Sequence, residues 1–208
     1  MPRKTQLFLA NFDPPALPAG RSFSEVLAAM NTLLATASPW VRAEAAPVTL
    51  PVLVARPGLF GPVELADVGT RLTDLLALSA SHGDWAIVGG TLEWRQGGAT
   101  RRVVPILHDG AVAALLADAP AGVDVDAELA TVSNVALDPV RTLATIVVDE
   151  VHLAVELDPA GGAIAAYSAV GISGVDLHVV LETRSQARGV PRGHVARELG
   201  YVFVCGHE

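Results

Sequence analysis

The sequence predicts an α+β domain in which two amphipathic helices from the N-terminal half pack on a mainly antiparallel sheet. Apolar residues recur at three- and four-residue steps within residues 22–36 and 67–79, which is the period of a helix. From residue 85 onward, apolar residues alternate with polar ones or form the short runs typical of strands. The later strands are separated by short turns, and strands connected in this way are usually antiparallel neighbours, so we expect a C-terminal meander.

Length and composition indicate one domain over residues 1–208. Of the 208 residues, 51% are hydrophobic and 17% are charged, which is ample apolar area for a folded core. No Gly/Ser-rich linker divides the chain. We divide it into an extended N-terminal arm (1–21), a mixed helix and strand half (22–120) and a strand-rich half (121–208).

The first predicted helix has a clear start and stop. The proline-rich segment 13–20 is a stiff connector, because each proline fixes its own φ and restrains the residue before it. Ser22 and Glu25 have the spacing of a capping box, in which each side chain satisfies the other residue's backbone N–H. Pro39 follows, so we expect the helix to end near Thr36.

The middle of the chain alternates between strand and helix patterns. Residues 48–55 are rich in Val and Leu and predict a buried strand. Because Pro51 has no N–H to donate to a sheet, we expect this strand at a sheet edge or with a bulge. The second helix covers residues 67–79. Period-two segments follow at 85–88, 92–94 and 101–107, and Gln96–Ala99 forms a hairpin turn. Residues 111–119 predict a short helix.

The C-terminal half is expected to contain mainly strands. The predicted strands are Thr142–Leu157, Ala163–Val170, Val175–Glu182 and Tyr201–Cys205. A small helix, His194–Leu199, interrupts the last connection, with Gly200 at its C-terminus.

Charge and motif content exclude several classes of function. A net charge of −8 argues against nucleic acid as a partner, because phosphate binding depends on Lys and Arg. No apolar run approaches the roughly 20 residues of a membrane span. The single cysteine, Cys205, excludes an internal disulfide and favours a reducing, cytoplasmic location. The phosphate-binding glycine loops and the Gly-x-Ser-x-Gly elbow are missing from the sequence.

Strand parity suggests one candidate metal site. Two histidines and four carboxylates fall on the polar faces of two predicted strands: Glu150, His152 and Glu156 on one, and Asp176, His178 and Glu182 on the other. Imidazole nitrogens and carboxylates are ligands for divalent metals and also serve in acid–base chemistry. The alternative is that these residues form the solvated face of an antiparallel sheet, which shows the same alternation without any function.

A second candidate pair lies at the C-terminus. Cys205 and His207 are two residues apart and would share a strand face, where a thiol and an imidazole can form a nucleophilic dyad. The alternative is a buried cysteine that acts as a small hydrophobic residue.

On sequence alone, the favoured function is a non-catalytic assembly subunit of a homo-oligomer or of a larger phage-like or secretion-like particle, with protein subunits as partners. Low surface charge and the proline-stiffened arm support this interpretation. The alternative is a small metal-dependent enzyme or ligand-binding protein that uses the face carrying His152 and His178. No cofactor is predicted, although a divalent metal is possible. The basic residues, 13 Arg and one Lys, suggest a GC-rich bacterial genome.

Overall fold

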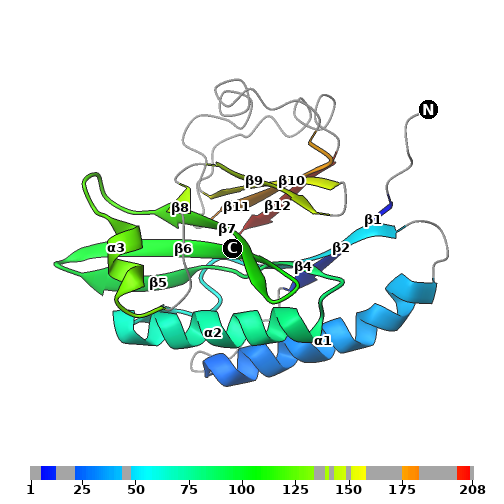
Figure 1. Ribbon diagram of the computed structural model, residues 1–208, viewed down its shortest axis with the longest axis horizontal. Helices are drawn as coiled ribbons and strands as arrows, with labels where there is room; N and C mark the ends of the chain where they lie inside the picture. The colour runs from blue at the N-terminus through cyan, green and yellow to red at the C-terminus, as the bar shows by residue number, and fades with distance from the viewer. Residues whose placement is uncertain are drawn as a thin grey trace.

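The computed structural model describes residues 6–12, 22–43, 48–133, 139–140, 143–148, 151–157, 175–182 and 201–206. These residues form three layers (Figure 1): a pair of long helices, a large mixed sheet, and a smaller sheet on the opposite side of the large one. The α+β class is therefore confirmed, but a mainly antiparallel meander is not.

Helix α1 (Phe23–Ala43) begins at the predicted capping box. The backbone N–H of Ser22 donates to a carboxylate oxygen of Glu25 at 2.8 Å, and the N–H of Glu25 donates to the Ser22 hydroxyl at 3.3 Å. The helix does not stop near residue 36 but continues through Pro39 to Ala43. Proline removes one helical hydrogen bond, and packing of Val41 against the core accompanies the extra turn.

Helix α2 (Leu65–Ser81) confirms the second predicted helix and extends it by two residues at each end. Its buried side packs, together with α1, against one face of the large sheet through Val68, Leu72, Leu75 and Leu78. Within the described ranges, no helix combines the length and the apolar character that a membrane crossing requires.

The large sheet, called sheet A here, is mixed rather than antiparallel. Its strands are β1 (Gln6–Phe12), β2 (Val48–Ala55), β3 (Pro62–Val63), β4 (Ala86–Val88), β5 (Leu92–Gln96), β6 (Ala99–His108), β7 (Ala111–Asp118) and β8 (Pro139–Val140). Strands β4, β5 and β7 are antiparallel to β6, whereas the other pairings are parallel. Strand β6 therefore runs opposite to all the others described in this sheet.

Two predictions about sheet A were wrong in detail. Residues 6–12 of the predicted arm form β1, which pairs along β2, so β2 is an interior strand and not the edge strand that Pro51 suggested. The register of this pairing shifts between Gln6 and Leu7, opposite Val48 and Leu50, so the alternative of a bulge near Pro51 agrees with the structure. Strand β4 pairs only with Val52–Val54, so this ladder does not need an N–H from Pro51. The hairpin turn at Gln96–Ala99 is confirmed as the link between β5 and β6.

Residues 111–118 form strand β7 rather than the predicted short helix. Asp109 and Gly110 both have positive φ, at 48° and 72°, and their turn folds β7 back along β6. An Asp-Gly pair is a preferred two-residue hairpin turn. This sequence signal outweighs the weak helical pattern of the alanines that follow it.

The smaller sheet, called sheet B here, contains β9 (Leu143–Val148), β10 (Val151–Leu157), β11 (Leu177–Glu182) and β12 (Tyr201–Gly206). Only β9 and β10 form an antiparallel pair, while β10, β11 and β12 are mutually parallel. Parallel neighbours require a crossover of a dozen or more residues, and the sequence between these strands is long enough. The predicted strand 163–170 and helix 194–199 fall in those connections and lie outside the described residues.

Two apolar cores hold the layers together. The helices bury one face of sheet A, and the other face of sheet A packs against sheet B through residues such as Val52, Val104, Leu153 and Val179. The short helix α3 (Val125–Ala130) lies beside sheet A on the helix side. Its N-cap, Asp124, accepts a hydrogen bond from the N–H of Ala127 at 3.1 Å.

Candidate functional site

The carboxyl ends of the parallel strands in the two sheets meet at one end of the sandwich. Val140 of β8 pairs with Leu116 of β7, and Leu143, which opens β9, pairs with Glu156 near the end of β10. Residues 140 to 143 span at most about 11 Å when extended, so the ends of β7 and β10 lie on the same side. Ligands of open α/β sheets bind beyond the carboxyl ends of the strands. We call this end of the sandwich the rim.

Three charged residues form a ladder across neighbouring strands of sheet A at the rim. Glu93 pairs with Arg102, and Arg102 pairs with Asp118, on β5, β6 and β7. Nε of Arg102 donates to Glu93 Oε2 at 3.0 Å, and Nη1 donates to Asp118 Oδ2 at 3.2 Å. Arg102 and Asp118 share strand parity with Val104 and Leu116, which pack against sheet B. The ladder therefore continues the face between the two sheets, beyond its apolar core.

The ladder is open to solvent on one side. The side chains of Arg102 and Glu93 are 22% and 24% exposed, and that of Asp118 is 49% exposed. Two carboxylates around one guanidinium leave a formal charge of −1. Such carboxylates can accept hydrogen bonds from N–H groups of a ligand or exchange a proton with it.

The turn that follows β2, at residues 56–61, is hydrogen-bonded to the connection between β4 and β5, at residues 89–91. The N–H of Gly58 donates to the buried Thr91 hydroxyl at 2.6 Å. Gly90 has a φ of +70°, and a β-carbon there would lie 3.2 Å from the carbonyl oxygen of Arg56. A side chain at residue 90 would strain both the backbone and this contact.

Arg71 of α2 supports the same turn from the helix side. Its Nη1 donates to the carbonyl oxygen of Phe60 at 2.9 Å, and its guanidinium lies 5.0 Å from the centre of the Phe23 ring. Burial lowers the pKa of Arg71 from its ordinary value, and the negative charge of Asp67 partly offsets this effect. These contacts fix the turn to both long helices.

A second ionic pair lies in sheet B. Glu156 and His178 are 2% and 0% exposed, and His178 Nε2 is 3.3 Å from Glu156 Oε2. Glu156 alternates with Val155 and Leu157, which face sheet A, so the pair lies on the other face of sheet B. Sequence reasoning assigned both residues to a polar face, but it did not pair them because the parallel register of β10 and β11 was unknown.

The predicted metal ligands do not come together as expected. His178 is buried, whereas His152 is exposed. The carboxylate of Asp176 accepts a hydrogen bond from the backbone N–H of His152 at 2.8 Å, so it caps the start of β10. Glu150 lies outside the described residues. Among the residues that are described, no three His, Cys, Asp or Glu side chains gather in a way that would hold a metal.

The predicted dyad is only partly covered by the structure. Cys205 lies in β12, where it pairs in register with Leu181, and Leu181 pairs with Leu157. Cys205 is therefore at the carboxyl ends of the parallel strands of sheet B. His207 lies outside the described residues.

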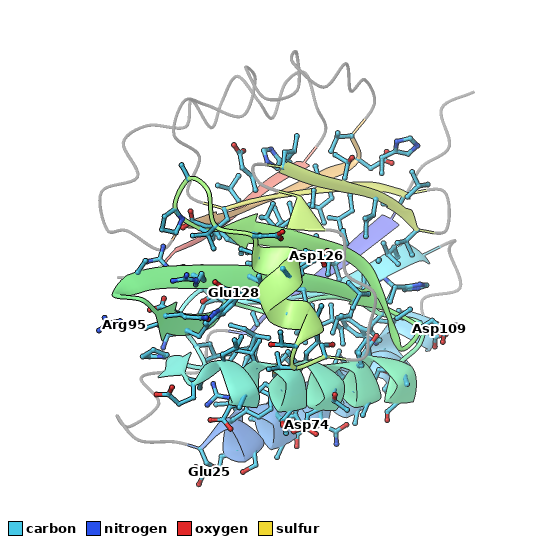
Figure 2. The ribbon with its side chains drawn as sticks, turned by 60° about the vertical axis from the view of Figure 1, so that its left-hand side comes forward. Glu25, Asp74, Arg95, Asp109, Asp126 and Glu128 are labelled. Carbon is cyan, nitrogen blue, oxygen red and sulfur yellow. The ribbon has the colours of Figure 1, made fainter. Side chains whose placement is uncertain are left out.

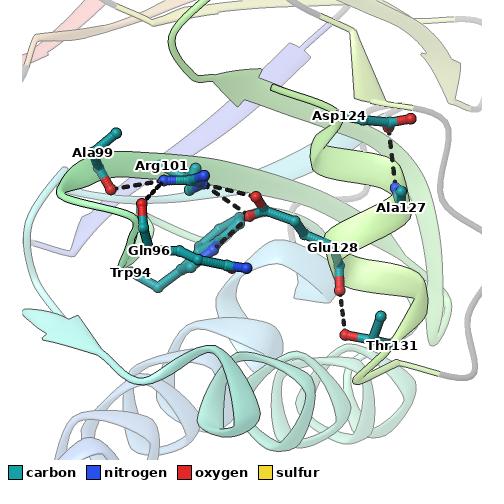
Figure 3. A network of polar contacts seen from close by, with 8 residues as sticks. All are labelled: Trp94, Gln96, Ala99, Arg101, Asp124, Ala127, Glu128 and Thr131. Atoms are coloured by element: carbon teal, nitrogen blue, oxygen red, sulfur yellow. Dashed lines mark hydrogen bonds and ion pairs between the residues drawn. The ribbon is translucent and has the colours of Figure 1, made fainter. Parts of the chain in front are cut away.

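A further polar network fastens α3 to sheet A (Figure 3). Nε of Arg101 contacts both carboxylate oxygens of Glu128, at 2.9 and 3.0 Å, and the indole N–H of Trp94 donates to the same carboxylate at 3.0 Å. Arg101 also donates to the carbonyl oxygens of Gln96 and Ala99. Because Arg101 and Glu128 are fully engaged with the hairpin and with each other, we assign this network a structural role.

The ends of sheet A differ in their charged groups. In Figure 2, Arg95 on β5 and Asp109 in the turn before β7 lie at opposite ends of the sheet, and Glu25 and Asp74 lie in the helix layer. The ladder belongs to the end nearer Arg95, because Glu93 precedes Arg95 by two residues on β5.

Comparison with known proteins identifies the fold. No family and no curated protein matches the sequence. Among solved structures, a cysteine-to-serine mutant of the Nesterenkonia AN1 amidase from the nitrilase superfamily matches with a TM-score of 0.58 and 15% identity, covering 99% of this chain and 78% of that one. Saccharomyces cerevisiae Nit3, a member of branch 10 of that superfamily, has a TM-score of 0.57 and 15% identity, covering 90% and 71%.

A carbon–nitrogen hydrolase from Helicobacter pylori G27 gives a similar result. Its TM-score is 0.57 and its identity is 11%, with 97% of this chain and 73% of that chain covered. A structure of a glutamate-to-leucine mutant of the Nesterenkonia amidase shows the acetamide moiety of fluoroacetamide covalently added at the active-site cysteine of that protein. At these identities the likeness establishes a nitrilase-like fold.

The prediction of a non-catalytic assembly subunit was wrong. The solved structures named above share this fold over 90–99% of this chain, and they include amidases and a carbon–nitrogen hydrolase rather than particle components. Low surface charge, on which the prediction rested, reflects composition and does not distinguish an assembly subunit from an enzyme.

Proposed function

We propose that this protein is a hydrolase that cleaves the carbon–nitrogen bond of a small amide at the rim. The observation that carries the proposal is the extent of the fold likeness, which covers 97–99% of the chain against amidase and carbon–nitrogen hydrolase structures. The rim also supplies polar groups at the place where α/β sheets bind ligands. Fold alone does not assign an activity, so the proposal depends on the residues at this end.

Cys205 is the nucleophile in this proposal. It is the only cysteine in the sequence, and a related fold forms its covalent adduct on a cysteine. The sulfur of Cys205 would attack the amide carbonyl carbon as the thiol gives up its proton, the C–N bond would break, and the amine would leave with that proton. Water would then hydrolyse the thioester, releasing a carboxylic acid and restoring the thiol. A thiol that must stay reduced favours a reducing compartment.

The ladder would bind the substrate in this reaction. The carboxylates of Glu93 and Asp118 are acceptors only when ionised, so they suit the N–H groups of an amide. Arg102 fixes both carboxylates and reduces their mutual repulsion. A neutral or cationic amide would therefore be preferred over an anionic one.

A second candidate is a ligand-binding protein that keeps the fold without thiol chemistry. It is favoured by the position of Cys205, which lies two strands away from β10 in sheet B. In the part of the chain that the structure describes, no observed contact joins Cys205 to the ladder or to the pair of Glu156 and His178. In this case the rim would bind small amides without turning them over.

Ammonia release from short aliphatic amides tests the proposal. The wild-type protein should hydrolyse at least one amide, and Cys205→Ser should not. Intact mass spectrometry with fluoroacetamide should show one adduct per chain on the wild type and none on Cys205→Ser. Binding of an amide without turnover or adduct would select the second candidate, and turnover by Cys205→Ser would eliminate Cys205 as the nucleophile.

A further inference from the structure

The outer face of α1 carries no charge. Figure 1 shows α1 beside α2 in the layer that covers one side of sheet A. Between Glu25 and Val41 the exposed residues of the helix are all uncharged, and they are Ala28, Asn31, Thr32, Ala35, Thr36, Pro39 and Trp40. Trp40 is 71% exposed, more than any other large hydrophobic side chain in the described part of the chain. Because a surface helix normally places charged and polar residues on the side away from the core, this face has the composition of a contact surface.

The threonine hydroxyls of this face are hydrogen-bonded within the helix. Thr32 Oγ1 donates to the carbonyl oxygen of Ala28 at 2.9 Å, and Thr36 Oγ1 donates to that of Thr32 at 2.8 Å. Burying a hydroxyl costs free energy only when its donor is left without an acceptor. These two side chains can therefore be covered by an apolar surface without losing a hydrogen bond to water.

Four residues of the outer face form a seam along the helix. The seam consists of Ala28, Thr32, Ala35 and Pro39, at steps of four, three and four residues. This spacing keeps residues on one side of a helix and recurs where two helices pack together. Small side chains along such a seam let two helix axes approach to about 8 Å. The outer face of α1 is therefore suited to a second helix.

We propose that the seam packs against the seam of a second copy of this chain, with the two α1 helices antiparallel about a two-fold axis at the level of Leu34. The only charged residues of α1 are Glu25 near its start and Arg42 near its end. Antiparallel pairing brings the acidic end of each helix to the basic end of the other, and such complementarity fixes orientation. The same axis brings Trp40 of one copy to the level of Ala28 of the other, and a two-fold contact makes each pairing twice.

Charge and size determine how strong this contact is. Each copy carries a formal charge of −8, so two copies repel one another least where the facing surfaces lack carboxylates. The 21 residues of α1 span about 31 Å, and one helix pair of this length buries less than the roughly 800 Å² per partner of a standard interface. We therefore expect a weak dimer, with a dissociation constant above about 1 μM.

Sedimentation equilibrium of the full chain from about 1 μM to 1 mM tests the proposal without reference to amide hydrolysis. The wild-type protein should change from monomer to dimer over this range. Ala35→Glu should weaken the dimer at least tenfold, because it places two carboxylates across the axis, and Trp40→Ala should do the same by removing the largest apolar contact. Ala66→Glu is the matched control, because it makes the same substitution at an exposed alanine of α2, and it should leave the dissociation constant unchanged. A wild-type protein that stays monomeric at about 1 mM, or a dimer that Ala35→Glu does not weaken more than Ala66→Glu, would overturn the proposal.

Disulfide cross-linking tests the antiparallel orientation. Antiparallel pairing separates the two copies of residue 35 by about 3 Å along the helix axis and the two copies of residue 28 by about 18 Å. A disulfide requires Cα atoms within about 7 Å of one another. In a Cys205→Ser background, Ala35→Cys should therefore form a covalent dimer under mild oxidation and Ala28→Cys should not. Cross-linking of both variants would indicate parallel helices, and cross-linking of neither would remove α1 from the interface; either result would overturn the proposal.

Discussion

Gly69 of α2 lies directly against the backbone carbonyl group of Val132, just beyond α3. The carbonyl oxygen of Val132 occupies the space that a β-carbon on residue 69 would need. Helix α2 therefore carries a glycine in its second turn, where alanine would be the better helix former. This close approach lets the segment after α3 pack against α2.

Gly69→Ala should destabilise the protein despite its higher helix propensity. Alanine favours the helix by about 1 kcal/mol relative to glycine. Overpacking against backbone, which cannot move like a flexible side chain, should outweigh this gain and leave a net loss of roughly 1–3 kcal/mol. Urea unfolding measures the difference. Thr70→Ala, at the next and exposed position, is the control and should change the free energy of unfolding by less than about 0.5 kcal/mol. Equal changes in the free energy of unfolding for the two substitutions would show that the close contact between residue 69 and Val132 does not determine the loss of stability.

Glu128→Ala should be among the more damaging substitutions outside the apolar core. It removes the acceptor of both Arg101 and Trp94 and leaves a buried guanidinium without its counter-charge. Breaking such a pair costs about 3–5 kcal/mol when both partners are buried, and the two carbonyl acceptors of Arg101 should reduce this to about 2–4 kcal/mol. Thermal or urea unfolding gives the value.

The double variant Arg101→Met with Glu128→Leu provides the control for this network. With neither charge present, its loss of stability should be smaller than that of Glu128→Ala alone. A double variant that is less stable than Glu128→Ala would contradict the view that the uncompensated charge dominates.

Asp118→Asn should affect amide hydrolysis more than stability. Asp118 is half exposed, and an exposed ion pair contributes at most about 1 kcal/mol. If the ladder binds the substrate, kcat/KM for a neutral amide should fall at least tenfold, mainly through KM. Asp126→Asn, on the exposed side of α3, is the control and should leave both quantities unchanged. A loss of stability without a change in kcat/KM would restrict the ladder to a structural role.

Local signals in the sequence predicted the elements better than their arrangement. The capping box of Ser22 and Glu25, the second helix and the hairpin at Gln96–Ala99 are confirmed because each depends on residues close together in the chain. The Asp109–Gly110 turn was also readable, but the alanine-rich stretch after it was interpreted as a helix.

The parallel pairing of β10, β11 and β12 could not be read from local patterns. Period-two alternation gives the two faces of a strand but not the direction of its neighbours. For the same reason, the sequence placed Glu156 and His178 on polar strand faces but could not show that the two are neighbours, which depends on the register of β10 and β11. Similarly, Glu93, Arg102 and Asp118 are far apart in the sequence and meet only through pairing on β6.

The proposed hydrolysis of amides depends on the thiol of Cys205. The most direct measurement is intact mass spectrometry of the wild-type protein and of Cys205→Ser after incubation with fluoroacetamide, with ammonia release followed in parallel. We expect one covalent adduct and ammonia release for the wild type, and neither for the variant. A wild-type protein that forms no adduct and releases no ammonia from any short amide would contradict the proposal.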